Sequence, residues 1–186
     1  MAQTSTPATV ADPAPLGLAA FALTTFVLSA ANAGFLPKSG EAVVLGLAFA
    51  YGGLAQFGAG MWEFKRNNTF GATAFTSYGA FWLSFFLLIT YFAPKIPPDA
   101  APTAIGFFLL AWGIFTAYMM IAALNLSKPI LTVFVLLTIT FFILAGGAFS
   151  SNPSMTMVGG YFGLATAFAA WYASAIGVIA ATKAST

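Results

Sequence analysis

The chain has 186 residues, of which 60% are hydrophobic and only 5% are charged, whereas a soluble domain carries about 25% charged residues. Six basic and four acidic side chains could not cover a water-facing surface, so we expect an integral membrane protein surrounded by the lipid bilayer. The basic residues form no patch for nucleic acid, and the absence of Cys and His removes the usual zinc and haem ligands, so no metal or cofactor is expected.

The N-terminal residues are rich in Thr, Ala and Pro, which predicts a disordered tail over 1–11. Asp12 is a good helix N-cap, and Pro13 suits the first helical position because it has no N–H to leave unpaired. An uncharged, mostly apolar run then continues to Phe35, long enough at 1.5 Å per residue to cross the bilayer core. We therefore expect the first membrane span to follow Asp12 directly.

Six apolar segments follow one another, separated by short polar connections that Pro, Gly and Asn punctuate. Each has about the length of a membrane-spanning helix. Irregular backbone is not viable against lipid, and the alternating strands of a membrane barrel do not occur in the pattern. The sequence predicts an all-α membrane protein with six transmembrane helices in one domain over 12–183, at about 16–35, 42–62, 70–92, 102–124, 130–149 and 155–182.

The basic residues also predict an orientation, because they are enriched in cytoplasmic connections. Four basic residues are expected on the same side of the membrane as the two chain termini: Lys65, Arg66, Lys128 and Lys183. Lys38 and Lys95 fall on the other side. We expect both termini in the cytoplasm and the protein in the plasma or inner membrane.

The six predicted spans contain no charged residue and no His. Proton pumps and coupled antiporters usually place an ionisable group within the membrane, so this pattern argues against them. It also argues against an enzyme, since no base could activate a Ser or Thr hydroxyl. Asp12 is interpreted as a helix cap, and Glu63 as part of an interfacial ion cluster with Lys65 and Arg66.

The polar side chains that remain inside the spans are hydroxyls and amides. On the first helix, Phe21, Thr24 or Thr25, Leu28 and Asn32 share one face by three- and four-residue spacing. A buried amide in hydrocarbon needs partners or water, so Asn32 and Gln56 are expected along a substrate path or between helices. Thr24, Thr25, Thr76 and Ser77 are further candidates for the path, although Ser and Thr often bond back to their own helix.

Small residues repeat every four positions on the last helix, at Gly159, Gly163 and Ala167. Such stripes let helix backbones approach closely in lipid, and they predict packing within or between protomers. A break of the second helix at Gly52 and Gly53, with a role in gating, is a less favoured hypothesis.

Two stretches of sequence carry specific motifs. The first is the run Asp12, Pro13, Ala14, Pro15, Leu16, Gly17 and Leu18. The second combines Gly-Met-Trp-Glu-Phe at 60–64, Asn-Thr-Phe-Gly at 68–71 and Thr-Ser-Tyr-Gly-Ala-Phe-Trp at 76–82. Together they resemble the acetate uptake transporter family, the succinate–acetate permeases, which usually has Asn at the position of Asp12. The resemblance extends over all six helices and is densest between residues 12 and 82.

The resemblance implies a six-helix protomer that assembles as a hexamer and moves acetate and small mono- or dicarboxylates such as succinate. It also implies a pore narrowed by an aromatic residue on the first helix, a Tyr on the third and a Leu on the fifth. These positions match Phe21, Tyr78 and Leu137. A hydrophobic constriction of this kind can close by dewetting, and the Tyr78 hydroxyl could donate to a carboxylate.

The sequence leaves the mechanism open between an anion channel and a proton-coupled transporter. A carboxylic acid with a pKa near 4.3 is protonated only to about 0.2% at pH 7, so proton-coupled uptake would be possible if the substrate carried the proton. A channel for a neutral solute such as urea or an amide would use the same hydroxyl and amide lining. A scaffolding protein without transport is the third alternative.

Overall fold

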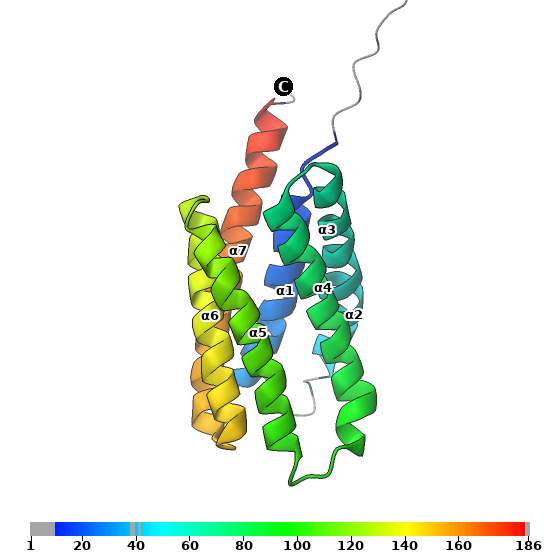
Figure 1. Ribbon diagram of the computed structural model, residues 1–186, viewed down its shortest axis with the longest axis vertical. Helices are drawn as coiled ribbons and strands as arrows, with labels where there is room; N and C mark the ends of the chain where they lie inside the picture. The colour runs from blue at the N-terminus through cyan, green and yellow to red at the C-terminus, as the bar shows by residue number, and fades with distance from the viewer. Residues whose placement is uncertain (1–9, 38–39, 41, 185–186) are drawn as a thin grey trace, which may run out of the picture.

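The computed structural model describes residues 10–37, 40 and 42–184, so most of the expected N-terminal tail lies outside the described residues. Within these residues, six helical segments are long and apolar enough to cross a membrane, and no strand is present. The segments run up and down in one bundle (Figure 1). The expected all-α architecture with six transmembrane helices is confirmed.

The helix bounds lie within a few residues of the expected spans. The first span is α1 (Ala14–Asn32), and the last three are α5 (Ala101–Ala123), α6 (Lys128–Phe149) and α7 (Pro153–Ala184). The second span is α2 (Val43–Phe49), the π-helix η2 (Ala50–Ala55) and α3 (Gln56–Lys65). The third is α4 (Thr69–Leu87), the π-helix η3 (Leu88–Phe92) and the 3-10 turn η4 (Ala93–Lys95).

The start of α1 differs by one residue from the expectation. Pro13 is the N-cap rather than the first helical residue, and its carbonyl accepts from the Gly17 N–H at 3.0 Å. Asp12 still satisfies a free donor of the first turn, because its Oδ1 accepts from the Ala14 N–H at 3.0 Å. The first helical turn therefore begins after Pro13, and Pro15 occupies a position where a missing N–H costs nothing.

The second span contains a π-helical segment at the glycine pair. A Cβ on Gly52 would lie 2.7 Å from Thr24 Oγ1 and 2.8 Å from Trp82 Cδ1, so only glycine lets α1 and α4 approach η2 this closely. The extra residue in a π-turn rotates the helix faces that follow it relative to those before it. The local irregularity suggested by the sequence is therefore present, and its role in gating stays a prediction.

The connections place the helix ends at two opposite ends of the bundle (Figure 1). The terminal end holds the start of α1, the α3–α4 and α5–α6 turns and the end of α7. The distal end holds the end of α1, the start of α2, the connection from η4 to α5 and the α6–α7 turn. Lys65, Arg66, Lys128 and Lys183 all belong to the terminal end, whereas Lys38 lies outside the described residues.

The helix α1 packs along α7, and α6 packs between α5 and α7. The small-residue stripe of α7 belongs to these contacts. A Cβ on Gly159 would meet the side chain of Leu144 at 2.5 Å, and one on Gly163 would meet the Ser29 hydroxyl. Ala167 is fully buried. Of the two uses the sequence left open, the stripe serves packing within one protomer.

Candidate functional site

A cavity of about 460 Å³ lies between the helices in the distal half of the bundle. On α1, α4 and α6 its lining runs from the middle of the helix to the distal end, and residues of α2, α5 and α7 complete the wall. Most lining side chains are apolar or aromatic. Such a cavity is roomy for a solute of a few heavy atoms.

The cavity ends near the middle of the bundle at Phe21, Phe81 and Leu137. All three side chains are at most 5% exposed. Tyr78 lies one helical turn beyond Phe81 toward the terminal end, and it does not line the cavity. One buried cluster contains all three residues expected to narrow the pore, which are Phe21, Tyr78 and Leu137. We call this expected narrow point the neck. The ring centroids of Phe21 and Tyr78 are 5.7 Å apart.

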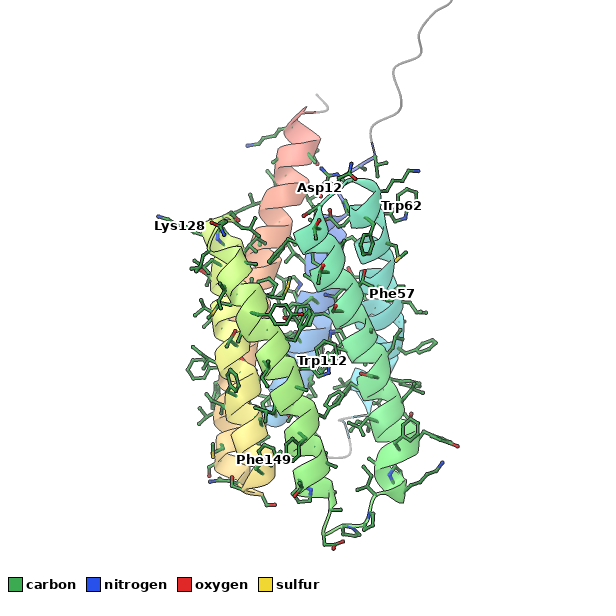
Figure 2. The ribbon with its side chains drawn as sticks, in the orientation of Figure 1. Asp12, Phe57, Trp62, Trp112, Lys128 and Phe149 are labelled. Carbon is green, nitrogen blue, oxygen red and sulfur yellow. The ribbon has the colours of Figure 1, made fainter. Side chains whose placement is uncertain are left out.

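Aromatic rings close the bundle behind Phe21. Tyr78 is 3% exposed, and its ring centroid lies 5.4 Å from Phe115, 6.1 Å from Phe134 and 6.2 Å from Trp112. Figure 2 shows Trp112 near the middle of the bundle, between Asp12 at the terminal end and Phe149 at the distal end. The cavity lining thus reaches the distal end of the bundle, and aromatic packing lies between the cavity and the terminal end.

The Tyr78 hydroxyl already has a partner. Its oxygen lies 2.9 Å from Thr116 Oγ1 on α5, and Thr116 Oγ1 donates to the Trp112 carbonyl at 2.7 Å. Because the single Thr116 proton goes to Trp112, Thr116 must accept from Tyr78. The Tyr78 donor that the sequence assigned to a carboxylate is therefore occupied, and it could reach a substrate only by leaving Thr116.

Sequence reasoning missed Thr116, although it is fully buried beside the neck. It lies 38 residues from Tyr78, and a Thr on an apolar helix is most simply read as bonding back to that helix, which Thr116 also does. No local sequence signal distinguishes Thr116 from other Thr residues whose hydroxyl donates to the carbonyl four residues earlier. Only the packing of α5 against the α4 side of the bundle reveals its second partner.

The polar candidates on α1 divide between two environments. Thr25 and Asn32 line the cavity, as expected for a substrate path. Thr24 does not line it, because the residue is fully buried against Gly52, and its hydroxyl donates to the Ala20 carbonyl at 2.9 Å. Thr25 is the member of the pair that faces the cavity.

Gln56, Thr76 and Ser77 do not line the cavity. Gln56 is 1% exposed, and the Thr76 hydroxyl packs against Gly60, where a Cβ would collide with it. Both residues lie where α3 and α4 pack closely together. Of the two roles that the sequence offered for Gln56, a position between helices is the one observed.

Five buried side-chain atoms among the described residues have no hydrogen-bond partner, and all lie on α1, α3 or α4. They are Thr25 Oγ1, Gln56 Oε1, Glu63 Oε1, Thr76 Oγ1 and Trp82 Nε1. Thr25 and Trp82 also belong to the cavity lining. A hydroxyl and an indole N–H can both donate to a carboxylate, so these two residues are unpartnered donors in a lining whose other polar side chains are Ser29, Asn32, Thr140 and Thr156.

Glu63 differs most from its sequence interpretation. It lies in the last turn of α3, it is fully buried, and it forms no ion pair with Lys65 or Arg66. Arg66 instead forms an ion pair with Asp12, and the Lys65 ammonium lies 5.0 Å from the centre of the exposed Trp62 ring. Glu63 is therefore a buried acid without an ion-pair partner among the described residues, rather than part of an ion cluster with Lys65 and Arg66.

The N-terminal motif, residues 12–18, holds α1 against its neighbours. The Pro15 carbonyl accepts from the Ser174 hydroxyl of α7 at 2.6 Å. A Cβ on Gly17 would lie 2.7 Å from the Phe75 ring of α4, so glycine allows this approach. The contacts of Pro15 and Gly17 explain the motif as a packing element at the terminal end.

Comparison with known proteins agrees with this arrangement. The family model described as the GPR1/FUN34/yaaH family matches residues 1–185. The chain belongs to this family. The resemblance to succinate–acetate permeases is confirmed, because relatives about 40% identical to the chain are named as acetate and succinate-acetate transporters.

Two relatives of the chain are named as transporters of acetate or succinate. The chain is 43% identical to acetate permease A of Emericella nidulans over 185 residues, covering 90% of this chain and 61% of that protein. It is 40% identical to the succinate-acetate/proton symporter SatP of Escherichia coli over 165 residues, covering 88% of this chain and 86% of SatP. These names describe transporters and not enzymes.

The fold also matches a solved structure, that of the bacterial acetate channel SatP. The TM-score is 0.86 at 36% sequence identity, and the match covers 92% of this chain and 93% of the other. The six-helix arrangement of this family member is therefore shared with that channel.

Proposed function

We propose that the protein moves acetate and related small carboxylates, including succinate, across a membrane. The observation that carries the proposal is the distal cavity that ends on Phe21 and Leu137. It is supported by the similarity to relatives named for acetate and succinate transport. The narrow point of the substrate path is the neck, the aromatic and apolar layer of Phe21, Tyr78 and Leu137.

The cavity lining suggests how a carboxylate would enter. Asn32 lies at the distal end of the lining, and Thr25 lies about one turn from Phe21 on the same helix. Trp82 adds an N–H without a partner. Preorganised donors replace the hydration of an anion at little cost, so these side chains would carry the substrate down to the neck.

Uptake of radiolabelled acetate into proteoliposomes tests the proposal. The rate should exceed that of protein-free vesicles, which must be subtracted because acetic acid crosses lipid unaided. Labelled urea in the same vesicles should enter no faster than without protein. Faster urea than acetate would support the neutral-solute alternative, and entry of neither solute would support a scaffolding protein.

We propose that the protein lies in the plasma or inner membrane with the terminal end in the cytoplasm, because most basic residues belong to that end. The chain has no Cys, so single Cys probes report position cleanly. In intact cells, an impermeant thiol reagent should label Asp99→Cys, in the exposed distal connection, and not Ser127→Cys in the exposed α5–α6 turn. Labelling of Ser127→Cys alone would reverse the orientation.

We further propose that the protein assembles as a homohexamer, as the family resemblance implies. A stripe on α5 leaves large apolar side chains exposed, among them Phe107, Ile114 and Ile121 at 57–61%. Such a face must meet lipid or a neighbouring protomer. Native mass measurement in mild detergent should give a closed particle of about six protomers. A monomer that retains full acetate flux would show that assembly is not needed for transport.

A further inference from the structure

The carboxyl group of Glu63 lies in a small polar site at the terminal end of the bundle. The side chain is fully buried, its Oε2 accepts from Asn68 Nδ2 at 2.9 Å, and its Oε1 has no partner. A Cβ on Gly71 would lie 2.9 Å from Oε1, so the glycine makes room for the carboxyl group. The protein thus encloses this acid without filling its hydrogen-bonding capacity.

Asn68 is held in one orientation by the helix it caps. Its Oδ1 accepts from the Gly71 N–H at 3.1 Å, and a backbone N–H can only donate. The amide nitrogen must therefore point to Glu63. The site consequently offers the carboxyl group one fixed side-chain donor and no second one.

The charged groups around Glu63 are few. The helices α1 and α4, which pack against α3, contain no charged residue. Asp12 precedes α1 and Arg66 follows α3, and these two form an ion pair with each other. Their side chains are 45% and 34% exposed, so water screens both charges. Glu63 is the buried acid beside this half-exposed pair.

Opposing influences act on the two protonation states of Glu63. An ionised carboxylate has about four acceptor positions and receives one side-chain donor here, and burying an unpaired charge is costly. The start of α4 and the nearby Arg66 favour the negative charge. Neither the ionised nor the protonated carboxyl group has all its hydrogen bonds made, so neither form is strongly favoured. The group can therefore change between the two forms, as a proton-transfer group must.

We propose that Glu63 is a proton-binding site, and that it takes up and releases one proton as a carboxylate crosses the neck. The proton binds to an oxygen of the Glu63 carboxylate and gives the neutral acid, and its release restores the carboxylate. This inference rests on the proposed function. It places the coupling proton on the protein rather than on the substrate.

The close contact between α3 and α4 connects this site with the middle of the membrane. On α3, Gln56, Gly60 and Glu63 recur at four- and three-residue spacing and therefore share a face. Thr76 of α4 packs on Gly60, between the levels of the other two. Glu63, Thr76 and Gln56 each present an unpartnered oxygen, so a row of polar groups, separate from the neck, leads inward from Glu63.

The test compares Glu63→Gln with Asp99→Asn in proteoliposomes. Both variants remove one carboxylate, but Asp99 is exposed in the distal connection. Exchange of labelled acetate at equal pH on both sides reports passage, and an entrapped pH dye reports protons carried with net acetate entry, after subtraction of protein-free vesicles. Glu63→Gln should retain exchange and lose the protein-dependent proton uptake, whereas Asp99→Asn should keep both.

Infrared difference spectra supply a readout that does not require transport. The parent and Asp99→Asn should show a protonated carboxyl band that disappears as the pH rises and is missing in Glu63→Gln. If Glu63→Gln does not fold, Glu63→Asp should shift the same band, because a shorter side chain moves the group relative to Asn68.

Three outcomes separate the inference from the proposed function. A parent protein without acetate exchange removes the proposed function, and the infrared titration alone then decides whether Glu63 binds a proton. A parent that exchanges acetate but carries no protons leaves the function standing and overturns the inference. Unchanged proton uptake per acetate in Glu63→Gln overturns it as well.

Discussion

Phe21→Ala should raise the flux of acetate through the protein and admit larger carboxylates. Phe21 is 5% exposed at the inner end of the cavity, and its ring lies against Tyr78. Removing the ring takes away one wall of the neck and lets water reach further, and hydrophobic constrictions open by wetting. If the ring supplies about 1.4 kcal/mol of the barrier, the flux should rise about tenfold. Uptake of labelled acetate and of a longer monocarboxylate measures the effect.

Phe26→Ala is the matched control for this prediction. Phe26 lies on the same helix, but its ring packs against Phe168 and Trp171 of α7 and does not line the cavity. Each substitution removes one partly or fully buried ring, which costs about 3–5 kcal/mol of stability when the ring is fully buried. A stability effect would therefore lower the activity of both variants. If Phe21→Ala leaves substrate range and leak as in the parent, Phe21 only packs and the gate lies elsewhere.

Tyr78→Phe should lower acetate flux, whereas Thr116→Val should not. The Tyr78 hydroxyl donates to Thr116 in this structure, so a carboxylate must compete with Thr116 for that donor. Tyr78→Phe deletes the donor, and losing a hydrogen bond to a charged group costs about 1.5–3 kcal/mol, or about tenfold to a hundredfold in rate. Thr116→Val removes the competing acceptor at nearly constant volume and should leave the flux equal to or above that of the parent.

The double variant tests whether the two residues act through one hydrogen bond. If they do, adding Thr116→Val to Tyr78→Phe should have no further effect, because the donor is already absent. Equal losses in both single variants would make the Tyr78–Thr116 bond a structural one. A rate that is nearly unchanged in Tyr78→Phe would favour passage of the neutral acid.

The sequence by itself determined the membrane class, the six spans and the family. These follow from local properties: the length of apolar runs, the scarcity of charge and the two motifs around residues 12–18 and 60–82. The number of spans could be predicted from local sequence alone, because each membrane-spanning helix must make its backbone hydrogen bonds within itself. Helix bounds were therefore predictable to within a few residues.

Only the tertiary structure decided which polar residues face the cavity and which face another helix. Helical periodicity places Thr24 and Thr25 near one face but does not say which neighbour that face meets, and the π-turn before Gln56 rotates the later faces again. The partner of Tyr78 comes from α5, far away in the chain. Glu63 lies next to exposed Trp62 and two residues before Lys65, yet close packing of α3 on α4 buries it, because Gly71 leaves space for its carboxyl group.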